Sequence, residues 1–258
     1  MSRKLSVFIP ALAMAVAVPV PVAAEPQDGR TLLEAAVEAA GGDAWLNPGT
    51  LVLEGDAVFY GEGNTPRAIA DDYRMWRVMD PDRTTSHGAD GKVRITARSG
   101  TRTIFEVGYD GETTWTDKGV MPRDQADAYW ASNFGFGIIR RALEPGFSVT
   151  QMPDRNIEGH PVNLVRITDP SGGQTLFGFD KESHYIRYMG FDTPKGFHER
   201  IYDGFYHPAN SKWVQARDVT LYYDGVKANT VHWTSVSVGT PIDPKIFAYP
   251  GTEPQKEQ

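Results

Sequence analysis

The stretch Leu51-Val-Leu-Glu-Gly-Asp-Ala-Val-Phe59 (LVLEGDAVF) decides the fold class, because its apolar residues recur at every second position. Leu51, Leu53, Ala57 and Phe59 form one apolar face, and the residues between them form a mixed face. A period of two is typical of a β-strand that is buried on one side. Similar segments follow at intervals of about 10 residues, namely DDYRMWRVM, KVRITAR, TRTIFEVGY and TTWT. This spacing predicts a meander of antiparallel strands.

The fourth and fifth of these segments are joined by the stretch GYDGETTW, which runs from Gly108 to Trp115. An Asp-Gly pair supplies the positive φ values that tight hairpin turns need, so Asp110-Gly111 predicts such a turn. Trp115 lies at the end of a short strand that leads toward a helical insert. We therefore expect its ring to pack between the sheet and that insert.

Two regions show helical patterns instead. Thr31 and Glu34 have the spacing of a capping box, and the Ala-rich run that follows ends at Gly41-Gly42, which predicts a helix from Thr31 to Ala40. Its apolar face would carry Leu33, Val37 and Ala40. A second helical insert is predicted between Met121 and Pro145, beginning at Pro122, with an aromatic face of Tyr129, Trp130 and Phe134.

Strand patterns return after the insert and continue to about residue 240. The segments are GFSVTQM, PVNLVRITD, QTLFGFD, SHYIRYMGF, ERIYDGFYH, WVQARDVTLYY and ANTVHWTSVSV. Turn-forming stretches separate them, including 169–173, 180–183, 208–211 and 224–225. We predict one β-rich domain over residues 25–250 and a polar tail over residues 251–258.

Residues 1–24 have the pattern of a secretory signal peptide. Arg3 and Lys4 precede an apolar run, and Val22-Ala23-Ala24 supplies the small residues that a signal peptidase recognises. The pattern predicts cleavage after Ala24 and export of the mature chain. In a bacterial cell this indicates the periplasm.

Charge and cysteine content narrow the possible functions. The formal net charge of −7 becomes −9 without residues 1–24, which contain Arg3 and Lys4 but no Asp or Glu. Such an acidic chain is a poor partner for nucleic acid. The sequence contains no Cys, which excludes disulfides, thiol catalysis, Cys-ligated metals and a lipidated N-terminal Cys.

The common catalytic motifs are missing from the sequence. It has no Gly-x-Ser-x-Gly elbow and no phosphate-binding Gly-x-x-x-x-Gly-Lys-Ser/Thr loop. The stretch HERIY at His198 resembles a zinc helix, but Tyr202 stands where the second His would be. Asp71-Asp72 and Asp80-Pro-Asp82 fit strand edges and turns better than an acid and base pair. We therefore predict no catalytic residues, no metal and no cofactor, although a metal site built from distant His and carboxylate residues stays open.

The order of these elements resembles the LolA-like superfamily, which includes periplasmic lipoprotein carriers and lipoprotein-sorting proteins. The resemblance rests on the helix ending in Gly-Gly, then LVLEGDAVFYG, YDGETTW, the helical insert, GHPVNLVRITD, TLFGFDKESHYIRYM and GTPIDPKIFAYP. It implies a mainly β fold in which a curved antiparallel sheet forms an incomplete barrel. Short helices would close this barrel as a lid, and a hydrophobic cavity would lie between the sheet and the lid.

The resemblance and the abundance of aromatic residues lead to a set of expected ligand-binding residues. These are the apolar and aromatic side chains that would face the cavity from the strands and the lid: Leu53, Phe59, Met75, Phe105, Trp115, Tyr129, Trp130, Phe134, Phe136 and Tyr188. The expected partners are a lipid or another hydrophobic small molecule, together with transient contacts to a membrane or to membrane-bound donor and acceptor proteins.

Three functions remain open from the sequence. The first is a non-enzymatic periplasmic protein that binds or transports a hydrophobic ligand, in outer-membrane lipid or lipoprotein trafficking. The second is a periplasmic hydrolase or isomerase that uses the same cavity with scattered His and carboxylate residues. The third is an envelope-assembly factor whose core is filled. The missing catalytic motifs and the many aromatic residues favour the first.

Overall fold

The computed structural model of the protein describes residues 28–209 and 211–252. The predicted signal peptide at 1–24 lies outside these residues, and so does the predicted tail from residue 253 onward. None of the helices in the described ranges combines the length and the apolar character that a membrane crossing needs.

A single antiparallel sheet makes up most of the fold. Its thirteen strands follow the order β6-β5-β4-β3-β2-β1-β13-β12-β11-β10-β9-β8-β7. The strands are β1 (Thr50–Tyr60), β2 (Pro66–Val78), β3 (Lys92–Ser99), β4 (Arg102–Tyr109), β5 (Thr114–Thr116), β6 (Gly119–Val120), β7 (Ser148–Ile157), β8 (His160–Thr168), β9 (Gln174–Asp180), β10 (Ile186–Thr193), β11 (Gly196–Asp203), β12 (Asp218–Tyr223) and β13 (Val226–Val238). The end strands β6 and β7 are not paired with each other, so the barrel is incomplete.

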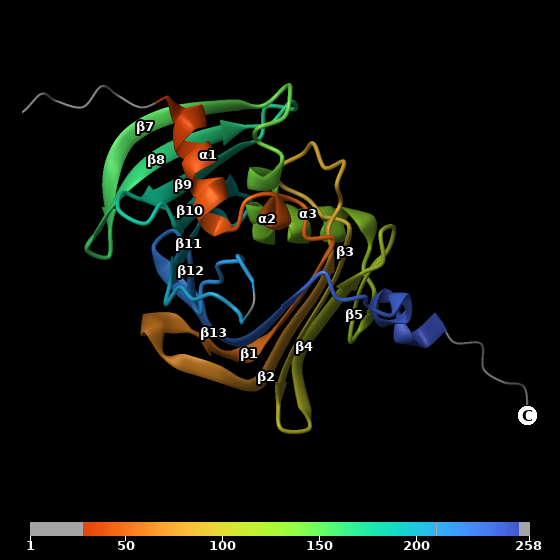
Figure 1. Ribbon diagram of the computed structural model, residues 1–258. Coiled ribbons are helices and arrows are strands. Elements are labelled where there is room, and N and C mark those ends of the chain that lie inside the picture. Colours follow the sequence, from red (N-terminus) through yellow and green to blue (C-terminus); the bar gives the residue numbers. More distant parts are fainter. Residues whose placement is uncertain (1–27, 210, 253–258) are drawn as a thin grey trace, which may run out of the picture.

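The sheet curves around the helices. In Figure 1 it runs from β7 to β10 at the upper left, past β13 and β1 at the bottom, to β3, β4 and β5 on the right, while α1, α2 and α3 lie in the opening. The helices are α1 (Gly29–Ala40), α2 (Asp43–Leu46) and α3 (Arg123–Asn133), with short 3₁₀ turns η1 (Glu62–Asn64), η2 (Phe136–Arg140), η3 (Pro244–Phe247) and η4 (Pro250–Thr252). The predicted mainly β fold with a helical lid is confirmed.

The opening stretch of the sequence forms β1 at the centre of this curve. Leu51, Leu53 and Ala57 are buried, as their alternation predicted. The pairing of β1 with β13 shifts register after Glu54, and at this bulge a Cβ on Gly55 would lie 2.0 Å from the carbonyl oxygen of His232. Bulges bend and twist a strand, so this glycine allows β1 and β13 to curve together.

The start of α1 differs from the prediction. The helix begins at Gly29 with Asp28 as its N-cap, two residues before Thr31, so the predicted capping box is wrong. Tertiary packing sets this start, because a Cβ at Gly29 would lie only 2.8 Å from the carbonyl oxygen of Val149 in β7. The predicted end at Gly41 and the buried face of Leu33, Val37 and Ala40 are confirmed.

The strands predicted between β11 and β12 are a second difference from the structure. The sequence predicts strands over ERIYDGFYH and WVQARDVTLYY, but β11 ends at Asp203 and β12 begins at Asp218. Residues 204–209 and 211–217 leave the sheet, and only the bridge between Tyr206 and Gln215 keeps a strand-like pairing. The amide of Val214 donates to the carbonyl oxygen of Ala40 at 2.9 Å. This segment therefore packs against the end of α1, and the ring of Trp213 lies against that of Trp45 in α2, with ring centroids 6.5 Å apart.

The predicted hairpin turn at Asp110-Gly111 provides a stability test. Gly111 has a φ of 111°, and the nearest atom to a Cβ built there is 3.8 Å away, so the backbone and not crowding makes glycine necessary. We expect Gly111→Val to lower the free energy of unfolding by about 1 kcal/mol, because a β-branched residue is strained at positive φ. Urea denaturation measures the loss. Gly88→Val is the control, because Gly88 has open space and no positive φ, and an equal loss in both variants would contradict the explanation.

Candidate ligand cavity

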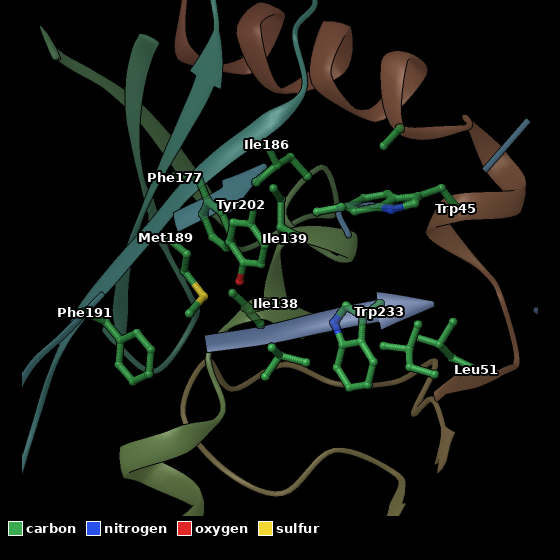
Figure 2. Packing of buried hydrophobic residues seen from close by; sticks show 14 of the residues in the cluster. Trp45, Leu51, Ile138, Ile139, Phe177, Ile186, Met189, Phe191, Tyr202 and Trp233 are labelled. Carbon is green, nitrogen blue, oxygen red and sulfur yellow. The ribbon is translucent and has the colours of Figure 1, made fainter. Parts of the chain in front are cut away.

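A cavity of about 240 Å³ lies between the concave face of the sheet and the lid. We use the word lid for α1, α2, residues 123–140 (α3, η2 and the two residues between them) and the segment formed by residues 204–209 and 211–217. The sheet contributes apolar side chains from both halves of its curve, namely Leu51, Leu53, Tyr73, Met75, Ile95, Phe105, Ile186, Tyr202, Leu221, Val231 and Trp233. In Figure 2 Trp45, Tyr202 and Trp233 lie around the same interior space, although they come from α2, β11 and β13.

The lid supplies the opposite wall of the cavity. Its contribution is also mainly aromatic and apolar, with Ala40, Trp45, Tyr129, Phe134, Phe136, Phe205, Trp213, Val214 and Ala216. Phe136 of η2 packs edge-to-face on Tyr202 of the sheet, with ring centroids 5.4 Å apart. The ring centroids of Tyr73 in β2 and Trp233 in β13 are 5.3 Å apart. Rigid rings that contact one another across the wall keep the shape of an apolar pocket while leaving space inside it.

Six of the ten residues expected to bind ligand line this cavity: Leu53, Met75, Phe105, Tyr129, Phe134 and Phe136. Phe59 lies behind them, with its ring edge-to-face on Tyr73 and Phe105. Trp130 is buried, and its indole N–H donates to the Thr114 hydroxyl at 2.7 Å, which joins α3 to β5. Whether any of these residues contacts a ligand stays a prediction.

Trp115 and Tyr188 lie away from the cavity. The indole N–H of Trp115 donates to the carbonyl oxygen of Phe247 at 2.7 Å, so the ring packs under η3 and the expected position between sheet and lid is wrong. The reason is the alternation of β5, because Thr114 already faces α3 and the next residue must face the other way. The Tyr188 hydroxyl donates to the carboxylate of Glu199 at 2.9 Å, outside the apolar cluster.

Several cavity residues were not predicted from the sequence. Trp45 follows the Gly-Gly that ends the first helix, and Trp213 lies in a segment that was predicted to be a strand. Three arginines, Arg77, Arg140 and Arg200, also line the wall. Arginines are rarely buried without a partner. Arg77 and Arg140 are buried, whereas Arg200 is partly exposed. No local pattern in the sequence marks these three, because their positions on the wall depend on segments that are distant along the chain.

The buried arginines have unequal partners. Arg77 forms an ion pair with Asp90, and Arg83 Nη1 lies 3.2 Å from the same carboxylate. The two guanidinium groups hold the pKa of Asp90 below its usual value, against the opposing effect of its burial. Arg140 has no carboxylate partner within 4 Å among residues 28–209 and 211–252. Its Nε donates to the carbonyl oxygen of Trp45 at 2.9 Å, and its guanidinium lies 4.3 Å from the Trp45 ring.

The C-terminal end of α3 is fastened to the sheet by three side chains of β11 and β12. His198 Nδ1 donates to the carbonyl oxygen of Ser132 at 2.9 Å, and the Tyr223 hydroxyl donates to the same oxygen at 2.9 Å. Arg200 donates from Nη2 to the carbonyl oxygen of Asn133 at 2.7 Å. The last carbonyls of a helix lack partners within the helix and carry partial negative charge, which a cation stabilises. We call this contact set the lid latch.

His198 is neutral in this arrangement. Its Nε2 accepts a hydrogen bond from Arg200 Nε at 3.0 Å, while Nδ1 carries the proton that it donates to Ser132. Burial, and then the nearby Arg200, lower the pKa of His198 to about 2. The ring is therefore a fixed part of the lid latch at neutral pH.

The polar groups on the cavity wall are guanidinium groups, tyrosine hydroxyls and side-chain amides. Burial raises the pKa of Tyr73 and of Tyr202 to about 12, so both hydroxyls keep their protons at neutral pH. Within the described ranges no group of three or more His, Cys, Asp or Glu residues is placed to hold a metal ion. The wall therefore offers apolar contacts and hydrogen-bond donors.

Known structures resemble this arrangement, although no family model and no curated protein matches the sequence. A putative outer membrane lipoprotein-sorting protein domain from Vibrio parahaemolyticus has 10% identity and a TM-score of 0.51, covering 85% of this chain and 97% of that one. A LolA superfamily protein from Nitrosomonas europaea has 9% identity and a TM-score of 0.53, with 87% and 99% covered. A DUF1329 family protein from Desulfovibrio piger has 7% identity and a TM-score of 0.54, with 88% and 100% covered.

These likenesses extend over nearly the whole length of each known structure and agree with the resemblance that the sequence indicated. At this level of identity they concern the fold. The described part of the chain therefore has the LolA-like fold, an incomplete β-barrel whose opening is covered by a helical lid.

Proposed function

We propose that this protein binds a lipid or another hydrophobic small molecule in the cavity between sheet and lid. The observation that carries the proposal is the cavity itself, which is walled by aromatic and aliphatic side chains from both the sheet and the lid. Small-molecule pockets have volumes of about 300–1,000 Å³, and the 240 Å³ of this cavity is close to the lower limit. Movement of the lid would enlarge it for a longer chain.

The proposed place of action is the periplasm, and the proposed role is the transport of the ligand between membranes or membrane-bound proteins. The signal pattern at residues 1–24 supports export. One protein of similar fold is described as an outer membrane lipoprotein-sorting domain, which supports a role in the cell envelope. The donors on the cavity wall, which keep their protons at neutral pH, favour ligand binding over hydrolase or isomerase chemistry.

Binding of a neutral apolar fluorescent probe, N-phenyl-1-naphthylamine, tests the proposal. We expect the wild-type chain to take up the probe, and Met75→Gln to weaken the affinity about 10-fold, because a polar amide would enter an apolar wall. Met75 lines the cavity and is only partly buried by its neighbours. Fluorescence titration measures the affinity, and urea denaturation checks that the variant is folded.

Val120→Gln is the matched control, because the Val120 side chain is 56% exposed on the edge strand β6. It should leave the affinity unchanged. Native mass spectrometry with lipid extraction, on protein purified from its own cells, then identifies the natural ligand. A wild-type protein that takes up no probe and carries no extractable apolar molecule would refute the proposed function.

A further inference from the structure

We propose that the ligand is an anionic amphiphile, whose apolar chain lies in the aromatic cavity and whose acid group pairs with Arg140. This inference rests on the proposed function and names the chemical class of its ligand. Its basis is a buried arginine that has no carboxylate partner within 4 Å among the described residues, placed where the aromatic cavity meets a second cavity with more charged residues on its wall.

Arg140 is 7% exposed and belongs to η2, which forms part of the lid. The hydrogen bond from Nε to the carbonyl oxygen of Trp45 uses one of its five N–H donors. The rings of Trp45, Trp213 and Phe136 lie 4.3, 5.6 and 5.6 Å from the guanidinium carbon. Aromatic faces hold a cation in place without neutralising it. The terminal nitrogens are therefore available for an acid group in a fixed orientation.

A second cavity of about 310 Å³ adjoins the aromatic one. Met79, Gly137 and Arg140 belong to the walls of both. Charged side chains make up a larger share of the wall residues in the second cavity, with Asp80, Arg83, Asp90 and Arg141. Arg140 therefore lies where an aromatic space meets one with more charged residues, as an amphiphile requires at the junction of its chain and its head group.

The charges around this boundary favour an anion. Arg77 and Arg83 share the single carboxylate of Asp90. Arg141 pairs with Glu144, whereas the hydrogen-bond partners of Arg200 are the neutral groups of His198 and Asn133. Asp80 on the outer wall is the other carboxylate that lines either cavity among the described residues. The boundary is thus rich in positive charge, although the whole chain has a net charge of −7.

Energetics support the same conclusion. Asp90 attracts Arg140, but Arg77 and Arg83 already pair with that carboxylate. A buried charge that is only partly compensated loses hydration that its surroundings do not replace. Burial is the main reason why the pKa of Arg140 falls to about 9, so the group still carries its charge at pH 7. The buried hydroxyl of Tyr202, on the same cavity wall, lies near Arg200 but makes no hydrogen bond of good geometry within the described ranges. An acid group would accept hydrogen bonds from Arg140 and Tyr202, and it would supply the negative charge that Arg140 lacks.

A ligand series with one chain length tests the inference. Displacement of N-phenyl-1-naphthylamine is measured with dodecanoate, dodecyl phosphate, methyl dodecanoate and dodecyltrimethylammonium. We expect the two anions to bind at least about 10-fold more tightly than the neutral ester, because a hydrogen bond to a charged group contributes an affinity of this order. The cation should bind most weakly. The ratio between the two anions tells which acid group the site prefers.

Two variants then locate the effect. Arg140→Gln should remove the preference for the anions while the ester binds as before, and Arg140→Lys, which keeps the charge but not the planar fork, should keep part of it. Arg123→Gln is the control, because it removes the same charge from a side chain that is 96% exposed. It should leave the preference intact.

The outcomes separate the inference from the proposed function. Equal binding of the ester and the anions by the wild type would refute the anionic class while leaving apolar binding in place, and an anion preference that survives in Arg140→Gln would refute the role of Arg140. Failure of every compound to bind would refute the proposed function instead. If Arg140→Gln does not fold, the wild-type series and Arg140→Lys decide the question.

Discussion

Trp115→Ala is expected to lower the free energy of unfolding by about 3–5 kcal/mol, the range for removal of a buried aromatic side chain, while the affinity for an apolar probe stays unchanged. The Trp115 side chain is 1% exposed and fixes the C-terminal 3₁₀ turn η3 to the outer side of β4 and β5. A Cβ on Gly108 would lie 2.1 Å from the indole ring, so the paired strand keeps a glycine to make room for it. Removal of the ring leaves a cavity and an unpaired carbonyl at Phe247.

Urea denaturation followed by circular dichroism measures the stability, and titration with N-phenyl-1-naphthylamine measures the affinity. Phe105→Ala is the comparison, because Phe105 lines the cavity and is only partly buried. We expect this variant to show the opposite balance, with a larger loss of affinity and a smaller loss of stability. If Trp115→Ala reduced probe binding while its stability stayed near that of the wild type, the ring would belong to the ligand site.

Lowering the pH from 7 to 5 is expected to lower the free energy of unfolding by about 2 kcal/mol through His198 alone. This value takes the ordinary histidine pKa of about 6.5 for the unfolded chain. The folded state keeps His198 neutral, because burial lowers its pKa to about 2. The unfolded chain takes up a proton below pH 6.5 and the folded chain does not. The unfolded state therefore binds more protons between these two values, and stability falls as the pH falls.

His87 acts in the same direction, because burial lowers its pKa as well. Carboxylates with a lowered pKa, such as Asp169 and Asp180 at about 2, contribute stability that is present above the ordinary Asp value and is lost at more acidic pH. The interval from pH 7 to pH 5 therefore reports mainly on the histidines. Urea denaturation at several pH values measures the slope.

His198→Gln should reduce the number of protons taken up on unfolding by about one in this interval, and it should also weaken the lid latch at pH 7. His207→Gln is the control, because His207 is exposed in the segment between β11 and β12. It should leave the pH profile unchanged. A profile in His198→Gln that is as steep as that of the wild type would show that His198 is not the source of the acid sensitivity.

Local patterns predicted most of the elements and the fold class. The alternation in LVLEGDAVF gave a strand with its buried face correctly assigned, and the Gly-Gly pair ended α1 where expected. A hairpin turn does join β4 and β5, but its loop spans residues 110–113, and of the Asp-Gly pair Gly111 alone has positive φ. The helical insert after Pro122 was also correct. Each of these depends on side-chain periodicity or on a φ value, which neighbours in the sequence decide.

The errors arose where distant segments meet. The start of α1 depends on the close approach of Gly29 to β7, and residues 204–209 and 211–217 leave the sheet to pack on α1. Trp115 was placed on the wrong side of β5, because alternation gives two faces but does not tell which of them the lid covers.

The sequence by itself therefore determined the strands, the main helices and a β-rich fold with many aromatic residues, because these depend on spacing along the chain. Only the tertiary structure decided which aromatic side chains surround the cavity and which fill the space behind it. It also decided that Arg140 lies without a carboxylate partner among the described residues, between three aromatic rings. The physical reason is that burial and charge pairing are set by contacts between segments about 100 residues apart, as in the hydrogen bond from Arg140 to Trp45, and such contacts leave no periodic signal in the sequence.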